Sequence, residues 1–288
     1  MKLLSSVLGG IGLGVVAALF TLGACGGDKS VPTGTGGSNA NVGGSGNTAG
    51  GSTGVNNSAG GSTSTSTGGT STASTGPKVV PTNPLMTDFS TMAEGTTITS
   101  TAPNMNWGDS SKTLTGGTFI YTQDATDAPT GTVTNGALVV TASIAASHYS
   151  GFGFYFGPNS GSDATAYTGF SFTISGNLAG TTVDVQVQTT PDYPLNDNSK
   201  GTCDWVGADA SSKYNYCKFP HVALATLLGT GGAVSATVQT VQAPWTAFSG
   251  GNPQSTVDQK QLLGIQFQFN CGSTACTPNI AIDNLTFY

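Results

Sequence analysis

Short runs of alternating apolar and polar residues dominate the chain from residue 78 to residue 288. The clearest runs cover residues 138–144, 170–175, 183–188 and 265–270, and Phe119 and Tyr121 form a shorter one. Gly, Pro, Asn and Asp separate the runs, and no long segment repeats apolar residues at the spacing of an amphipathic helix. A period of two is typical of antiparallel strands with one buried face. We therefore predict an all-β fold, a two-sheet antiparallel β-sandwich.

The final run changes phase near its middle. Ile280 and Ile282 share one parity, whereas Leu285 and Phe287 share the other. One extra residue at positions 283–284 would restore the inward direction, and such an extra residue defines a β-bulge. The sequence therefore predicts a bulge inside the last strand.

The first 24 residues have the pattern of a secretory signal, with Lys2 in front of an apolar stretch. The stretch ends in Leu-Gly-Ala-Cys, which resembles the lipobox of bacterial lipoproteins. This resemblance implies cleavage before Cys25, lipidation of Cys25 and, with Asp28 three places later, a lipid-anchored protein of the outer membrane or cell surface. The alternative is an uncleaved membrane helix, because about 20 apolar residues can span a bilayer. Four glycines between positions 9 and 14 weaken such a helix.

Residues 25–77 follow as a second region, nearly all Gly, Ser, Thr and Asn after Cys25 and without an aromatic residue. A segment of this composition has too little apolar surface to offset the entropy of ordering it. We predict a disordered linker that holds residues 78–288, the β-sandwich domain, near the membrane. The lipid anchor is then the expected membrane contact.

Four cysteines remain after Cys25, an even number in a compartment where disulfides persist. Four cysteines allow three pairings, and the sequence does not choose among them. Closeness in the chain favours Cys203–Cys217 and Cys271–Cys276, the second across the turn before the last strand. Their spacings do not match the CxxC pairs of a zinc site.

Charge argues against several classes of partner. All eight basic residues are Lys, and the formal net charge is −6. Nucleic acid needs a basic surface and is read largely by Arg, so we expect no nucleic-acid partner. Acidic polysaccharides are disfavoured for the same reason. Neutral ligands remain, and we expect a monomer.

Residues able to carry out catalysis are few. A glycosidase uses two carboxylates across the bond, but Glu94 is the single Glu of the chain. Most of the thirteen Asp residues sit in turn-like sequences, where Asp caps the backbone. His148 and His221 have no partner at the spacing of a known triad or metal motif. We therefore expect no enzyme activity, with a glycan-active enzyme using Asp carboxylates as the alternative.

Amide side chains occupy the polar positions of two predicted strands. Amides offer donors and acceptors that suit sugar hydroxyls, and a bare aromatic ring suits the flat face of a pyranose. Tyr155 is expected to point outward, with glycines on either side keeping its ring clear. Trp205, inside a predicted loop, is a second aromatic candidate. The predicted ligand-binding residues are Tyr155, Asp184, Gln186, Gln188, Gln266, Gln268 and Trp205.

A further candidate site pairs the two ends of the domain. Asp88 lies in the first predicted strand and Asp283 in the last. Carboxylate oxygens from neighbouring strands suit Ca²⁺, so we predict a structural calcium site there. The alternative is two acids of ordinary turns.

Several of these segments resemble the jelly-roll carbohydrate-binding modules with a galactose-binding-like topology. The resemblance covers roughly residues 84–288 and is carried by residues 86–90, 151–156, 167–176 and 282–287. It implies a jelly roll, sugar binding and a calcium ion beside the terminal strands, which adds weight to Asp88 and Asp283. Such modules usually close with two adjacent acidic residues. Here the second of the two positions is Asn284, so this chain departs from the pattern.

Together these features favour a surface-anchored, non-catalytic binder of neutral polysaccharide. The alternatives are the glycan-active enzyme already described and a structural or adhesive surface protein whose sandwich binds another protein. A groove lined with amides and a ring would favour the first, and a large exposed apolar patch the last.

Overall fold

The computed structural model describes residues 78–99, 106–107, 114–157, 161–195, 200–204, 216–230 and 232–288. The described part is built almost entirely from two antiparallel sheets, which confirms the predicted two-sheet sandwich. Cys25 and Trp205, together with the predicted signal and linker, lie outside the described residues. Among the described residues, no helix is long and apolar enough to cross a membrane.

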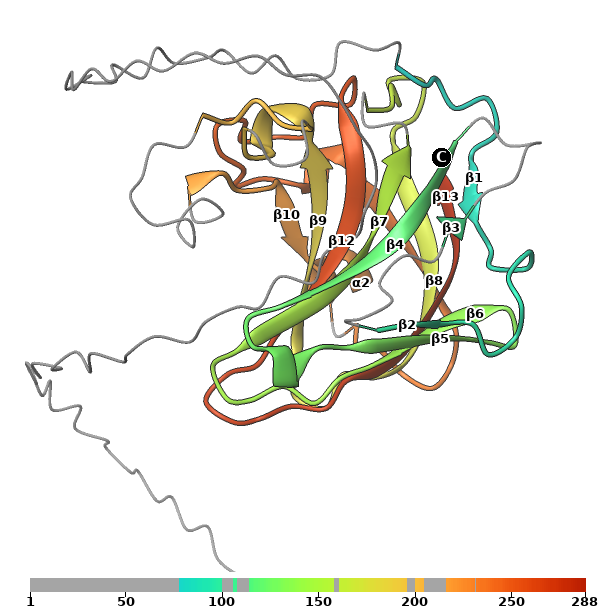
Figure 1. Cartoon of the computed structure of the whole chain (residues 1–288), viewed down its shortest axis with the longest axis vertical. Helices are drawn as coiled ribbons and strands as arrows, with labels where there is room; N and C mark the ends of the chain where they lie inside the picture. Colours follow the sequence, from blue (N-terminus) through green and yellow to red (C-terminus); the bar gives the residue numbers. More distant parts are fainter. Residues whose placement is uncertain are drawn as a thin grey trace, which may run out of the picture. The chain divides into compact units, whose positions relative to one another are not determined.

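The first sheet appears in Figure 1 as the row from β10 to β4. Its six strands follow the order β10-β9-β12-β7-β4-β3. Their bounds are β3 Asn106–Trp107, β4 Thr115–Thr122, β7 Tyr149–Gly157, β9 Thr182–Thr189, β10 His221–Ala223 and β12 Leu262–Asn270. β12 lies between β7 and β9, so that Gln266 stands opposite Gly153 on one side and Gln186 on the other.

The second sheet has seven strands in the order β11-β8-β13-β6-β5-β2, and β1 also pairs with β13. Their bounds are β1 Leu85–Thr87, β2 Thr97–Ile98, β5 Thr130–Thr134, β6 Ala137–Thr141, β8 Gly169–Asn177, β11 Gln239–Pro244 and β13 Asn279–Phe287. The described helical elements are short: η1 Ala125–Asp127, η2 Thr190–Asp192, α2 Leu224–Leu228 and η4 Trp245–Ala247.

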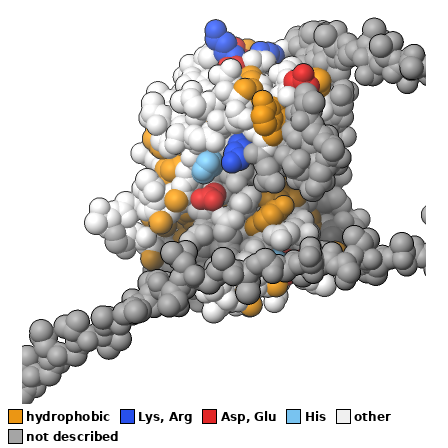
Figure 2. Space-filling view, turned by 90° about the vertical axis from the view of Figure 1, so that its left-hand side faces the viewer, with side chains coloured by type: hydrophobic (Ala, Val, Ile, Leu, Met, Phe, Trp, Pro, Cys, Tyr) orange, Lys and Arg blue, Asp and Glu red, His pale blue; other side chains and the backbone are white. Residues whose placement is uncertain are grey.

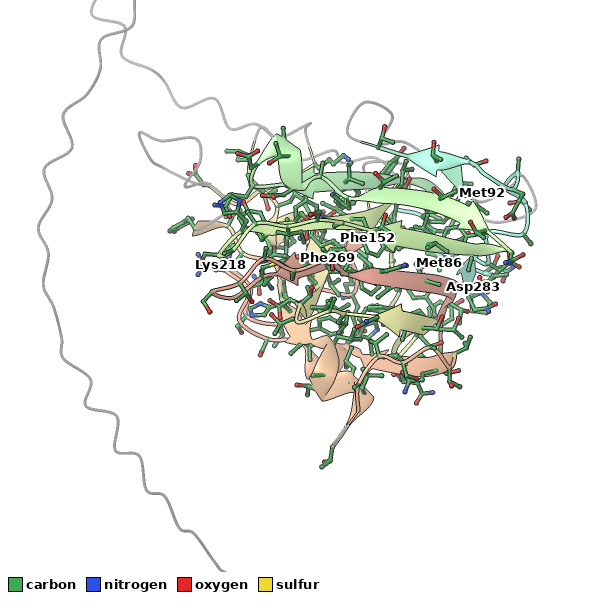
Figure 3. All side chains as sticks on the ribbon, turned by 90° about the horizontal axis from the view of Figure 1, so that it is seen from below. Met86, Met92, Phe152, Lys218, Phe269 and Asp283 are labelled. Carbon is green, nitrogen blue, oxygen red and sulfur yellow. A yellow bond between two sulfur atoms is a disulfide. The ribbon has the colours of Figure 1, made fainter. Side chains whose placement is uncertain are left out.

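Phenylalanine rings from both sheets fill the space between them. Phe152 of β7 and Phe267 of β12 stack with centroids 5.1 Å apart, and Phe172 of β8 meets Phe267 edge-on at 5.1 Å. These three side chains are completely buried. Figure 3 shows Phe152 and Phe269 in the interior, with Lys218 and Asp283 at opposite ends of that view. Removing one such ring costs about 3–5 kcal/mol of stability.

The predicted bulge in β13 is confirmed. The pairing of β13 with β8 changes register between Asp283 and Thr286, and both Ile282 and Leu285 are buried. Asn284 adopts a φ of 51°, a left-handed conformation that Asn tolerates better than most residues. The extra residue therefore returns the side chains of the second half of the strand to the core.

Both disulfides favoured by proximity are present. Cys203–Cys217 joins Cα atoms 6.0 Å apart, and Cys271–Cys276 joins Cα atoms 5.7 Å apart. The second closes the connection between β12 and β13, as predicted.

Candidate functional site

A groove of about 620 Å³ lies on the outer face of the first sheet. Strands β4, β9 and β12 supply its floor, and β10 with the segment before it supplies one wall. The described residues that line it are Phe119, Tyr121, Thr122, Tyr149, Asp184, Gln186, Gln188, Tyr193, Cys217, Lys218, Phe219, His221, Gln266 and Gln268. Five of the predicted ligand-binding residues, Asp184 and the four glutamines, thus meet in one place.

Two rings from β4 lie flat across two glycines of β7. A Cβ added to Gly153 would come within 2.4 Å of the Phe119 ring, and one added to Gly151 within 2.5 Å of the Tyr121 ring. The two rings have centroids 6.1 Å apart and planes 31° apart, so they form one aromatic strip. Both rings are half-buried. Only residues without a side chain leave room for rings to lie this close to the sheet.

This arrangement corrects the expectation for β4. The alternating run predicts that Phe119 and Tyr121 face the core. In the structure Thr118 faces the core instead and is completely buried. The signal that could have revealed it is the Gly-x-Gly of β7, because glycines on one strand leave space for aromatic rings from its neighbour.

The hydroxyl of Tyr121 is buried and has no hydrogen-bond partner among the described residues. Burial raises the pKa of Tyr121 well above its usual range, and Tyr149 and Asp184 add to the rise. The phenol therefore stays protonated and is a donor without an acceptor among the described residues. A buried polar atom of this kind is uncommon in folded proteins and marks a place where a ligand or water can bind.

The amides of β9 and β12 are joined in one continuous hydrogen-bonded chain. Gln188 donates to Gln266 at 2.7 Å, Gln266 to Gln186 at 2.7 Å, and Gln186 to Gln268 at 3.1 Å. Gln268 then donates to Asn270 at 2.8 Å, and Asn270 donates to Asp184 at 3.0 Å. We call these six residues the amide chain.

The amide chain is ordered yet retains capacity for a ligand. Gln188 and Gln266 are each 6% exposed, and the others are half-buried. A primary amide has two N–H donors and two acceptor positions on its oxygen. Each amide from Gln266 to Asn270 uses one of each within the chain. One donor and one acceptor per amide remain, which matches hydroxyl groups that both donate and accept.

The wall beside β9 carries Lys218 and His221. His221 of β10 pairs with Gln186, and its Nδ1 lies 3.2 Å from the Phe219 carbonyl oxygen. Lys218 lies three residues before β10 and directly after Cys217. The Cys203–Cys217 disulfide therefore anchors this wall. With Asp184 on the floor, the described groove holds charges of both signs. On the face that Figure 2 draws, charged side chains are scattered among uncharged ones rather than gathered in a patch.

Tyr155 lies apart from the described groove lining, away from the five predicted ligand-binding residues that meet there. Its ring lies on Gly117, where an added Cβ would come within 2.4 Å of the phenol, and Lys200 Nζ is 5.2 Å from the ring centroid. The side chain does point outward, between the buried Phe154 and Phe156. Its ring lies between a neighbouring strand and a lysine, so it is less bare than the sequence indicated, and its role in ligand binding stays a prediction.

Asp88 and Asp283 lie near each other at the junction of β1 and β13. Burial raises the pKa of Asp283, the Asp88 carboxylate adds to the rise, and hydrogen bonding from Asn284 opposes it. Asn284 donates to both oxygens of Asp283, and Ser90 donates to Asp88. Two adjoining carboxylates fit a hard cation, but Ca²⁺ takes six to eight oxygens. No group of three acidic, His or Cys side chains suited to a metal occurs among the described residues. The calcium site stays a prediction.

No model of a protein family matches the chain, and no curated protein matches it significantly. Among solved structures, the family 11 carbohydrate-binding module from Clostridium thermocellum, in complex with a β-1,3-1,4-mixed-linked tetrasaccharide, is 12% identical. That alignment covers 72% of this chain and 95% of the module, with a TM-score of 0.38.

A family 30 carbohydrate-binding module is 11% identical over 67% of this chain and 91% of its own, again with a TM-score of 0.38. The glycoside hydrolase domain of Endo-D from Streptococcus pneumoniae is 10% identical over 59% of this chain but 21% of that protein, with a TM-score of 0.34. The two modules are of the class that the sequence motifs resemble. Scores this low establish no shared fold by themselves, so the strand pairing carries the fold assignment.

Proposed function

We propose that the groove binds a neutral polysaccharide and does not cleave it. The observation that carries this proposal is the amide chain lying beside the aromatic strip of Phe119 and Tyr121. The strip offers ring faces for the apolar face of a pyranose, and the amides offer paired donors and acceptors for its hydroxyls. Sugar sites need both kinds of contact in one concave surface.

The charges of the groove support a neutral ligand. Lys218 on the wall is balanced by Asp184 on the floor, and the whole chain carries a formal net charge of −6. An anionic polysaccharide would meet few cations and an overall repulsive field.

The carboxylates of the groove support binding without cleavage. Asp184 is the one carboxylate among its described lining residues, and it already accepts a hydrogen bond from Asn270. Glycoside hydrolysis uses a pair of carboxyl groups about 5–9.5 Å apart. The groove therefore has the composition of a binding site.

We also propose that lipidation at Cys25 holds the protein at the bacterial outer membrane or cell surface. The lipobox pattern of residues 22–25 and the glycine-rich composition of residues 26–77 support this proposal. A tether of that length and composition would let the groove sample polysaccharide within roughly 40 Å of its anchor.

Isothermal titration of the purified protein against neutral β-glucans, xylan and mannan tests the function. We expect at least one of them to bind, and Gln186→Ala to weaken binding, because this amide occupies the middle of the amide chain. Chromatography after long incubation should find the polysaccharide length unchanged. Released oligosaccharides would favour the enzyme hypothesis, and a protein that binds no neutral glycan would favour the adhesive one.

A further inference from the structure

The five hydrogen bonds of the amide chain all point the same way, from Gln188 to Asp184. An amide by itself has no preferred direction, because exchanging its nitrogen and oxygen preserves its shape. A run of amides can therefore point either way with the same number of hydrogen bonds. A group at one end of the chain must therefore fix the direction of its hydrogen bonds.

Asp184 fixes this direction, because a carboxylate only accepts hydrogen bonds. Asn270 must turn its Nδ2 toward Asp184, which leaves its Oδ1 to accept from Gln268. Gln268 must then present its oxygen to Gln186, and the same requirement passes along to Gln188. Reversing any one amide within the chain would place two N–H donors against each other on one side of it and two oxygen acceptors against each other on the other side.

We propose that Asp184 is a positioning residue that fixes the direction of the whole amide chain, and through it the direction in which a glycan lies in the groove. The part concerning the glycan rests on the proposed function, whereas the part concerning the amides does not. Ring and glycosidic oxygens of a sugar chain accept only, while its hydroxyls both donate and accept. A groove whose free N–H and C=O groups stand in a fixed order therefore distinguishes a glycan from the same glycan turned end for end.

The first test needs no ligand. In Asp184→Asn, the new amide can donate or accept, so both directions of the chain become possible. Gln188 lies four residues along β9, roughly 13 Å away at 3.3 Å per residue. In NMR spectra of the ¹⁵N-labelled protein, we expect one set of side-chain amide signals for wild type. The variant should show a second or shifted set that extends to Gln188.

Asp163→Asn is the matched control, because it removes the same charge from a turn outside the groove, where Asp163 accepts from Thr165. It should leave the Gln188 signals unchanged. If Asp184→Asn alters Asn270 but not Gln188, Asp184 has only a local role and the inference is wrong.

The second test uses the best-binding oligosaccharide of the neutral panel, with a spin label at its reducing end. Wild type should show paramagnetic broadening at one end of the groove, near Gln188 or near Asn270 but not both. Asp184→Asn should show it at both ends. Its dissociation constant should stay within about twofold of wild type, because each direction of the amide chain binds the glycan in one of the two orientations.

The outcomes separate this inference from the proposed function. Equal broadening at both ends in wild type contradicts the directional role while leaving glycan binding intact. If wild type binds no member of the panel, the proposed function and the glycan part of the inference fail together. The ligand-free amide signals then decide the remaining part.

Discussion

At the scale of single residues, the floor of the groove carries a hydroxyl donor, that of Tyr121, with no acceptor among the described residues. The Tyr121 hydroxyl is buried without a partner among the described residues, and the groove lies directly beside it. An unsatisfied buried polar atom costs about 1–3 kcal/mol, which a ligand oxygen would recover on binding. Such a group contributes to binding and not to stability.

Tyr121→Phe should therefore weaken glycan binding without loss of stability. The ring stays on Gly151, and only the hydroxyl is removed. We expect binding about 3- to 10-fold weaker, from the usual 0.5–1.5 kcal/mol of one hydrogen bond. The melting temperature should stay constant or rise, and titration with thermal melting checks both. Unchanged affinity together with a lower melting temperature would contradict this role.

Asp192 is a buried acid in η2, directly after β9, and has a structural role. Its side chain is completely buried, it accepts from Thr189 Oγ1 at 2.6 Å and from the Gln254 N–H at 2.8 Å, and burial raises its pKa to about 6. The folded protein therefore holds the proton more tightly than the unfolded chain does. The resulting stability is fully present below the ordinary pKa of 3.8 and is lost as the pH rises to about 6.

Asp192→Asn should remove this part of the pH dependence. The amide has the shape of the protonated acid and no charge. Between pH 4 and pH 7, the wild type should lose up to about 3 kcal/mol through this group, at 1.36 kcal/mol per pKa unit. The variant should be more stable than wild type at pH 7 and comparable at pH 4. Chemical denaturation at both pH values measures this, and a variant less stable at pH 7 would refute it.

At the scale of elements, alternation was sufficient to predict the strands but not every face. In β9 and β12 the apolar and amide positions differ so clearly that the buried side and the amide side follow from the sequence. In β4 both Phe119 and Tyr121 are apolar enough for the core, and only the glycines of β7 in three dimensions allow them outside. The surroundings of Tyr155 could not be predicted for a related reason, because its contacts with Gly117 and Lys200 come from distant parts of the chain.

At the junction of β1 and β13, a bound cation would link the first strand to the last and stabilise their pairing. If Ca²⁺ binds Asp88 and Asp283, it should raise the melting temperature, by about 2.7 kcal/mol of stability at a hundredfold excess over its dissociation constant. Asp283→Ala should abolish that increase. Equal melting of wild type in calcium and after exhaustive chelation would show that the two acids hold no such ion.

At the scale of the whole molecule, the described chain begins next to the sheet that carries the groove. Val79 bridges to Ser162, which in turn bridges to Leu262, the first residue of β12.

Cys25→Ser tests the proposed anchor. Without the thiol no lipid can be attached, so the protein should leave the membrane fraction and the detergent phase in phase separation. The wild type should remain in both. A variant that partitions like wild type would point to the uncleaved membrane helix.

The central claim is that a glycan binds over Phe119 and Tyr121 beside the amide chain. The most direct measurement compares two outward aromatic residues of one sheet, one inside the groove and one outside it. In titration against the best-binding neutral glycan, Phe119→Ala should weaken binding by about tenfold or more, since a stacking contact and its buried area are lost. Tyr155→Ala should bind within about twofold of wild type, a difference below 0.5 kcal/mol. Loss of binding in Tyr155→Ala with full binding in Phe119→Ala would contradict the account.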